Sequence, residues 1–253
     1  MNYRTKHLKE ELVKLESVEE RLELLREKYS DCKAVILATG PSLNDYDLTS
    51  LYDRDDIVIL SIKQAQDKVK GQSDFHIVNT YNFDKYNGYD YGNLDCIIFY
   101  GLSQSFVPQQ MEKLAIKPHP VDIWVPVVNP PSITYEQTIH KSADYDKMFM
   151  LGNETKTWWG TSILYEQAIP MALLLGCKDI TTVGWDLGTG THSYSHKEST
   201  FKVDQAQSQY AQDSINTTPQ LYDWCEKNNI NLKICSSTNP ADSRFKRTKP
   251  NTI

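Results

Sequence analysis

Residues 33–43 read Lys33-Ala34-Val35-Ile36-Leu37-Ala38-Thr39-Gly40-Pro41-Ser42-Leu43, and this stretch decides the expected fold. Its first half is a short apolar run rich in branched residues, which predicts a buried β-strand. Gly40 then lets the backbone turn where a side chain would obstruct it, and Pro41 fixes the direction in which the chain leaves. In open α/β sheets, such a turn at the carboxyl end of a strand is where nucleotides bind. The alternative is a tight connection that holds no ligand.

Short apolar runs of this kind recur along the chain and alternate with helical or irregular segments. Helices are expected over residues 104–114, from about Ser162 to Leu175, and from Thr218 to about Lys227, with Gly176 as the stop signal of the second. This alternation predicts an α/β, Rossmann-like domain with a mostly parallel sheet and helices on both faces. The predicted strands are residues 33–37, 57–62, 75–78, 95–99, 121–125, 179–183 and 232–235.

The chain is expected to have three parts. Residues 1–31 contain an amphipathic helix over 4–28, in which leucines recur at three-, four- and seven-residue steps between charged side chains. We expect this helix to pack on the domain, and the alternative is pairing between subunits of a homo-oligomer. Residues 32–240 form the Rossmann-like domain, with a proline-containing insertion at 126–159 that is either a lid over the ligand face or a surface excursion. Residues 241–253 form a basic tail.

Composition narrows the class of protein. The chain has 253 residues, 40% of them hydrophobic, which suffices for one large α/β domain with a full core. A net charge of −6 argues against a nucleic-acid partner. The five cysteines show no C-x-x-C spacing and sit mostly in or beside apolar runs, so they are predicted to be buried thiols. No apolar run has the length of a transmembrane helix and the N-terminus lacks a signal-peptide core, so the expected location is the cytoplasm.

Several polar stretches follow one another in an order that resembles the bacterial sialyltransferases, which build lipo-oligosaccharides from CMP-sialic acid. The motility-associated flagellin glycosyltransferases and the archaeal hydroxymethylpterin pyrophosphokinases are related to them. The resemblance covers residues 33–65 and 157–240. The stretches that carry it are Gly40-Pro41-Ser42-Leu43, Gln64 and Asn79 at strand ends, Gly160-Thr161-Ser162, Gly176 to Asp186, Ser193-Tyr194, and Ile234-Cys235-Ser236-Ser237.

The resemblance implies a glycosyltransferase that moves sialic acid or a related nonulosonate from a CMP-sugar to a glycan, glycolipid or protein acceptor. The donor is then a co-substrate, and neither a cofactor nor a metal is implied. Tyr194 would hydrogen-bond the leaving phosphate. The triplets Asp53-Arg54-Asp55 and Asp144-Tyr145-Asp146 are therefore interpreted as surface charges. The residues implied to bind substrate are Thr39, Gly40, Pro41, Ser42, Gln64, Asn79, Gly160, Thr161, Ser162 and Asp186.

The general base is where this chain departs from the family pattern. The sialyltransferases place a histidine shortly before the last helix, and here Asp213 lies near that place. His192 and His196 lie about twenty residues earlier. A histidine with an ordinary pKa of about 6.5 can accept the proton of an acceptor hydroxyl, whereas a carboxylate needs a raised pKa. We expect His192 to be the base, with Asp213 and His196 as the alternatives.

Two other functions fit parts of the pattern. A hydroxymethylpterin-type diphosphokinase using ATP and magnesium would need acidic metal ligands at strand ends, where this chain has Asn79. A non-catalytic nucleotide-binding protein would explain the missing family histidine. The cations of the tail, at Arg244, Lys246, Arg247 and Lys249, suit either peripheral contact with the inner face of an anionic membrane or a solvated chain end.

Overall fold

A computed structural model describes residues 3–69, 72–79, 95–101, 121, 123–124, 168–187, 205–236, 239–249 and 253. Seven of the described strands fall close to the predicted ranges, because each predicted run is short and rich in apolar or β-branched side chains. The eighth, at residues 246–247, lies in the predicted basic tail, where the sequence predicts no strand. The strands are β1 (Lys33–Leu37), β2 (Ile57–Ile62), β3 (Phe75–Asn79), β4 (Ile97–Gly101), β5 (Ile123–Trp124), β6 (Asp179–Val183), β7 (Asn231–Cys235) and β8 (Lys246–Arg247).

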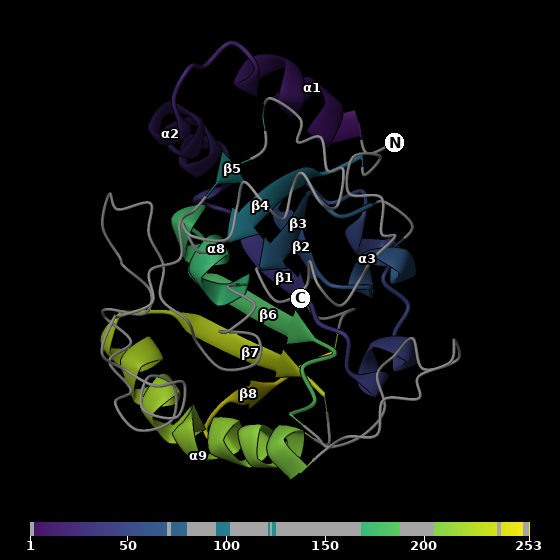
Figure 1. Ribbon diagram of the computed structural model, residues 1–253, viewed down its shortest axis with the longest axis vertical. Coiled ribbons are helices and arrows are strands. Elements are labelled where there is room, and N and C mark those ends of the chain that lie inside the picture. The colour runs from purple at the N-terminus through teal and green to yellow at the C-terminus, as the bar shows by residue number, and fades with distance from the viewer. Residues whose placement is uncertain are drawn as a thin grey trace.

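These strands form one sheet in the order β5-β4-β3-β2-β1-β6-β7-β8 (Figure 1). Every pair of neighbouring strands in this order is parallel. The chain therefore winds outward from β1 to β5, returns to place β6 on the other side of β1, and winds outward again. The expected α/β, Rossmann-like fold with a parallel sheet is confirmed.

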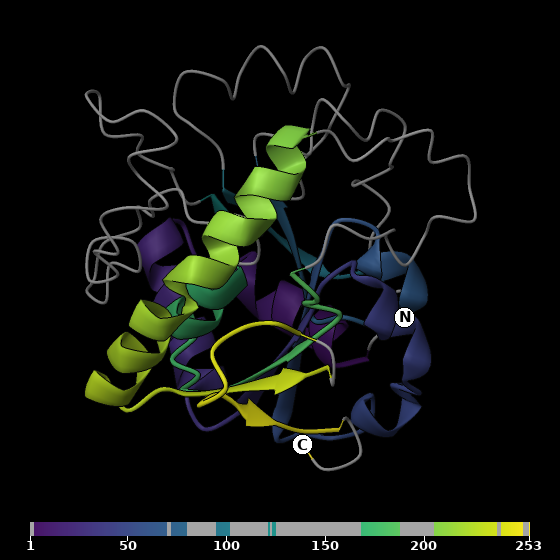
Figure 2. The ribbon, with the colours of Figure 1, turned by 90° about the horizontal axis from the view of Figure 1, so that it is seen from below.

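Helices lie on both faces of the sheet, as predicted (Figure 2). Ala34 and Ile36 of β1 belong to one hydrophobic core, whereas Val35 and Leu37 belong to a second core on the opposite face. The first core is covered by α1 (Tyr3–Leu12), α2 (Val18–Tyr29), α8 (Ala168–Leu174) and α9 (Gln205–Lys227). The second is covered by the 3₁₀-helices η1 (Pro41–Asp45) and η2 (Thr49–Leu51) and by α3 (Ala65–Lys68).

The N-terminal segment forms two helices, so the prediction of one helix over residues 4–28 is wrong. The break has a local cause, because the Ser17 hydroxyl accepts the backbone N–H of Glu20 and the Glu20 carboxylate accepts that of Ser17. This reciprocal capping box starts a new helix. The leucines of both helices, including Leu12 and Leu25, are buried in the first core. The apolar stripe therefore packs on the domain, as expected.

The last helix also differs from its predicted bounds. It begins at Gln205, thirteen residues before the predicted start at Thr218, and Pro219 lies inside it. Proline has no N–H to donate to the carbonyl four residues earlier, which is that of Ile215. The Thr218 hydroxyl donates to this carbonyl oxygen at 2.7 Å. The threonine thus satisfies the group that the proline leaves, and the helix continues through the proline.

The basic segment 241–253 is attached to the domain. Phe245 is buried in the first core, and Lys246 and Arg247 form β8 beside β7. The Arg244 guanidinium lies 2.6 Å from the Asp223 carboxylate and 4.4 Å from the centroid of the Tyr222 ring. Removing residues 244–253 would therefore remove a strand, and membrane contact through this segment stays a prediction. Among the described helices, none has the length and apolar character needed to cross a membrane.

Candidate functional site

The candidate site lies where the direction of winding reverses. β1 stands between β2 and β6, so the chain leaves β1 toward one side of the sheet and leaves β6 toward the other. The crevice outside the carboxyl ends of two such strands is where open α/β sheets bind their ligands. The predicted turn at Ala38–Ser42 follows β1, and Gly184-Trp185-Asp186-Leu187 follows β6. Two segments separated by about 145 residues thus meet at one point.

Backbone hydrogen bonds hold these two turns together. The Ala38 N–H donates to Val183 O at 2.8 Å, and the Gly40 N–H donates to Gly184 O at 2.7 Å. The contact needs both glycines. A Cβ on Gly40 would lie 2.4 Å from Gly184 O and from Asp186 Oδ2, and a Cβ on Gly184 would lie 2.4 Å from Ala38 O. The expectation that Gly40 permits a turn that a side chain would obstruct is confirmed.

Asp186 joins the turns through its side chain. Its Oδ2 accepts the backbone N–H of Ser42 at 2.8 Å, and its Oδ1 accepts the Ser42 hydroxyl at 2.5 Å. Two residues predicted to bind substrate are therefore bound to each other. Both donors that Ser42 could offer to a nucleotide point at this carboxylate. Asp186 thus fixes the first turn of η1 against the end of β6.

Among the described non-glycine residues, two of the three with a positive φ lie at the same edge of the sheet, and the third, Asn229, precedes β7 at the opposite edge. Lys63 follows β2 with a φ of +48°, and Leu187 closes the β6 turn with a φ of +49°. This left-handed conformation costs a non-glycine residue about 1–2 kcal/mol, and such strain clusters at functional sites. Of the described side chains, few polar atoms are both buried and without a hydrogen bond, and two of them follow strands at this edge. These atoms are Gln64 Oε1 after β2 and Ser236 Oγ after β7.

Tyr46 ties the end of η1 to the end of β7. Burial raises the pKa of Tyr46 to about 12, helped by a hydrogen bond with the Cys235 thiol and by the negative charges of Asp45 and Asp186. Burial also raises the pKa of Cys235 to about 11, although its hydrogen bond with Tyr46 acts in the opposite direction. Both groups are therefore neutral near pH 7. The pair supports the site and supplies no charge to it.

Asn239 connects the segment after β7 to the β6 turn. Its side-chain N–H donates to the carbonyl oxygen of Trp185, and its Oδ1 accepts the backbone N–H of Ala241 at 2.7 Å. Arg247 donates to the carbonyl oxygens of Asn239 and Ala241 at 3.1 and 3.0 Å. Arg247, at the end of β8, therefore supports the β6 turn through Asn239, and its charge is used within the fold.

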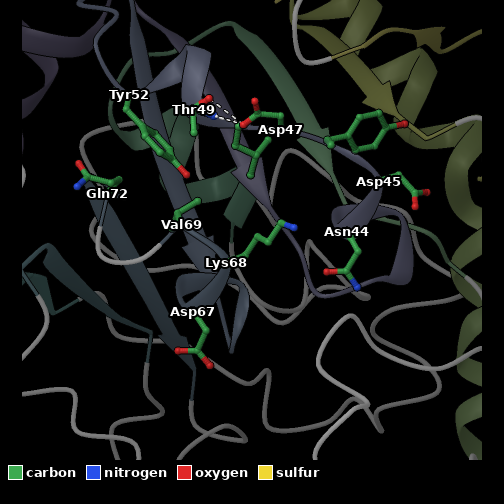
Figure 3. A pocket seen from close by; sticks show the side chains of 11 residues that line it. Asn44, Asp45, Asp47, Thr49, Tyr52, Asp67, Lys68, Val69 and Gln72 are labelled. Carbon is green, nitrogen blue, oxygen red and sulfur yellow. Dashed lines mark hydrogen bonds between the residues drawn. The ribbon is translucent and has the colours of Figure 1, made fainter.

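A hollow of about 740 Å³ lies beside this edge, between the segment that follows β1 and the segment that follows β2 (Figure 3). Its walls include the Tyr52 side chain and the Asp47 carboxylate, which accepts the N–H and hydroxyl of Thr49. These hydrogen bonds lower the pKa of Asp47, so the group stays ionised. Three aspartates and one lysine give the walls an excess of negative charge, which disfavours a phosphate. The charged residues are Asp45, Asp47, Asp67 and Lys68.

The structure thus brings five of the predicted residues together at the switch point, namely Thr39, Gly40, Pro41, Ser42 and Asp186. It places two more, Gln64 and Asn79, at neighbouring strand ends. The side chain of Asn79 lies outside the described part of the chain, and so does that of Asp213, which belongs to α9. The insertion 126–159 and the triplet at 144–146 also lie outside it. The predicted residues outside the described ranges are Gly160, Thr161, Ser162, His192, Tyr194 and His196.

Tyr46, Ser236 and Asn239 were not predicted as part of this site. Ser236 and Asn239 follow a predicted strand, and polar residues at a strand end are a signal that could have found them. Tyr46 had no such signal, because its role depends on Cys235, which is distant in sequence. Within the described ranges, no group of three or more His, Cys, Asp and Glu side chains is arranged to hold a metal ion. Asp53 and Asp55 are exposed, as expected of surface charges.

Comparisons with protein-family models, with curated proteins and with solved structures found no match. The likeness to the sialyltransferases therefore rests on the order of the motifs in the sequence.

Proposed function

We propose that this protein is a glycosyltransferase that uses a CMP-sugar, carrying sialic acid or a related nonulosonate, as its donor. The observation that supports a nucleotide ligand best is the meeting of the Gly40 and Gly184 turns at the switch point of a parallel sheet. The left-handed backbone of Lys63 and Leu187 at the same edge adds to it. The choice of a CMP-sugar comes from the resemblance of the motifs.

In this proposal each residue has a role that follows from its position in the chain. Thr39 to Ser42, Gln64 and Asn79 surround the nucleotide and the transferred sugar at the carboxyl edge. Tyr194 follows Asp186 within eight residues of the chain, so it can be delivered to the leaving phosphate and stabilise its growing charge. His192 accepts the proton of the acceptor hydroxyl, and Asp213 and His196 are the alternatives. The acceptor is a glycan, a glycolipid or a protein.

The first expected result is a nucleotide preference. CMP at a hundred times its dissociation constant should stabilise the protein by about 2.7 kcal/mol and raise its melting temperature by several degrees, in the absence of added metal. ATP at the same concentration should leave the melting temperature unchanged. Differential scanning calorimetry with and without magnesium measures both. An equal shift with ATP, or a shift that requires magnesium, would favour the diphosphokinase over the transferase.

The second expected result is transfer itself. Incubation with CMP-sialic acid and a galactoside should add the mass of the sugar to the acceptor, as read by mass spectrometry. Tyr194→Phe should lower turnover about a hundredfold while donor affinity changes little, because the phenol acts on charge that develops in the transition state. Release of CMP without a modified acceptor would contradict transfer to a galactoside. Binding of CMP with neither release nor transfer would favour a non-catalytic binding protein.

A further inference from the structure

From Gly40 to Leu43, the hydrogen-bond donors of the turn after β1 are engaged within the chain. The Gly40 N–H donates to Gly184 O, the Ser42 N–H and hydroxyl donate to Asp186, and the Leu43 N–H donates to Gly40 O at 3.1 Å. Pro41 has no N–H. In nucleotide-binding α/β folds, the phosphate sits at this first turn and accepts such donors. Here a carboxylate of the protein accepts two of them.

The carboxylate is held in place and is not the only negative charge nearby. Asp186 packs so closely on Gly40 that a Cβ there would lie 2.8 Å from its Cγ. Its two hydrogen bonds come from backbone and side chain of one residue, which fixes its orientation. Asp45 stands at the other end of η1, and both carboxylates act electrostatically on Tyr46. A phosphate group that approaches the turn therefore meets fixed negative charge.

We propose that Asp186 is a specificity-determining residue that selects nucleotides by the charge of their phosphates. The inference rests on the proposed function, because it requires a nucleotide phosphate at this turn. Repulsion from a fixed carboxylate grows with every further charge placed within a few ångströms of it. A single phosphate, as in CMP or a CMP-sugar, is tolerated. The diphosphate of CDP and the triphosphate of CTP are disfavoured.

Asp186→Asn tests this role with little change of shape. The amide oxygen can still accept the Ser42 N–H, and the amide N–H can donate to the Ser42 hydroxyl, so the variant removes the charge and keeps two hydrogen bonds. Isothermal titration in EDTA gives the dissociation constants of CMP, CDP and CTP. We expect the preference for CMP over CTP to fall about tenfold or more in the variant, while the affinity for CMP changes less than about threefold.

Asp53→Asn is the matched control, because Asp53 is exposed, lies in the β1–β2 connection and changes the net charge by the same amount. It should keep the preference of the wild type. An unchanged preference in Asp186→Asn overturns the inference while the proposed function stands. A large loss of CMP affinity with an unchanged preference also overturns it, since Asp186 would then contact the substrate directly. Failure of all three nucleotides to bind the wild type overturns both proposals.

A second measurement needs only the wild-type protein and applies even if the variant does not fold. Raising the ionic strength screens the repulsion, so the preference for CMP over CTP should narrow between about 0.05 M and 0.5 M salt. A preference that does not depend on salt contradicts selection by charge.

Discussion

Replacing Gly184 by alanine is expected to destabilise the protein by about 3 kcal/mol. Two costs combine at this position. Gly184 has a φ of +74°, and an alanine in that left-handed region costs about 1–2 kcal/mol. The new Cβ would also lie 2.4 Å from Ala38 O and 2.9 Å from Leu43 Cβ, and forced overlap in a packed interior costs about 1–3 kcal/mol. Unfolding in urea, followed by circular dichroism, measures the sum.

Gly176→Ala is the matched control for this prediction. Gly176 ends α8 with a φ of +86°, as expected of a helix stop signal, so the backbone cost is similar. Its nearest neighbour is more distant, since the new Cβ would lie 3.1 Å from Ser30 Cβ. We expect a cost of about 1–2 kcal/mol for this variant. Equal losses in the two variants would show that the close approach of the β1 and β6 turns contributes nothing beyond backbone conformation.

Acidification is expected to destabilise the protein through His76, by about 1.4 kcal/mol for each pH unit between pH 6 and pH 4. His76 lies on β3 opposite Ser61 of β2, with its Nδ1 at 3.0 Å from the Ser61 hydroxyl. Burial lowers its pKa from 6.5 to about 3, because the charged ring would lose its hydration. In this window the unfolded chain binds the proton and the folded protein does not. The contribution of neutral His76 to the free energy of unfolding is therefore fully present above pH 6.5 and is lost as the pH falls toward 3.

The slope of stability against pH identifies His76 as the source. Gln66 and Ser73 share a buried hydrogen-bond network with Ser61, so His76→Gln will itself cost stability. Its loss between pH 6.5 and pH 5 should nevertheless be smaller than that of the wild type by about 2 kcal/mol. His7→Gln, at an exposed position on α1, should keep the wild-type slope. Identical slopes in all three proteins would place the acid sensitivity elsewhere.

The charge of Asp186 connects the site to these stability experiments. Gly40 and Gly184 bring the two turns close enough for the carboxylate to reach Ser42, so a variant that separates the turns should also loosen the control of phosphate charge. The preference for CMP over CTP can thus also be measured in Gly184→Ala, at a temperature where this variant remains folded, and compared with that of the wild type. The glycine pair and the carboxylate act as one structural unit.

The sequence by itself determined the class of fold and the position along the chain of the turn at which the candidate site lies. The run Ile57–Ile62 is short and mostly apolar, so its burial on both faces of a parallel sheet follows from composition and length. The run Asp179–Val183 is short and rich in β-branched side chains, which also favour a strand. The turn at Gly40-Pro41-Ser42 was recognisable from its glycine and proline. Two boundaries were missed although the signals were local, namely the capping box at Ser17 and the threonine that lets α9 continue through Pro219.

Only the tertiary structure decided what surrounds that turn. The contact of Gly40 with Gly184 and of Ser42 with Asp186 depends on β6 returning to the side of β1, after more than a hundred intervening residues. Because β6 lies beside β1, the Ser42 hydroxyl donates to Asp186. The pairing of Tyr46 with Cys235, which are distant in sequence, likewise depends on the order of the strands. Local sequence patterns indicate which backbone conformation a residue favours and which side chains are buried. They do not indicate the order of the strands in the sheet, and this order determines which polar groups meet at the carboxyl edge.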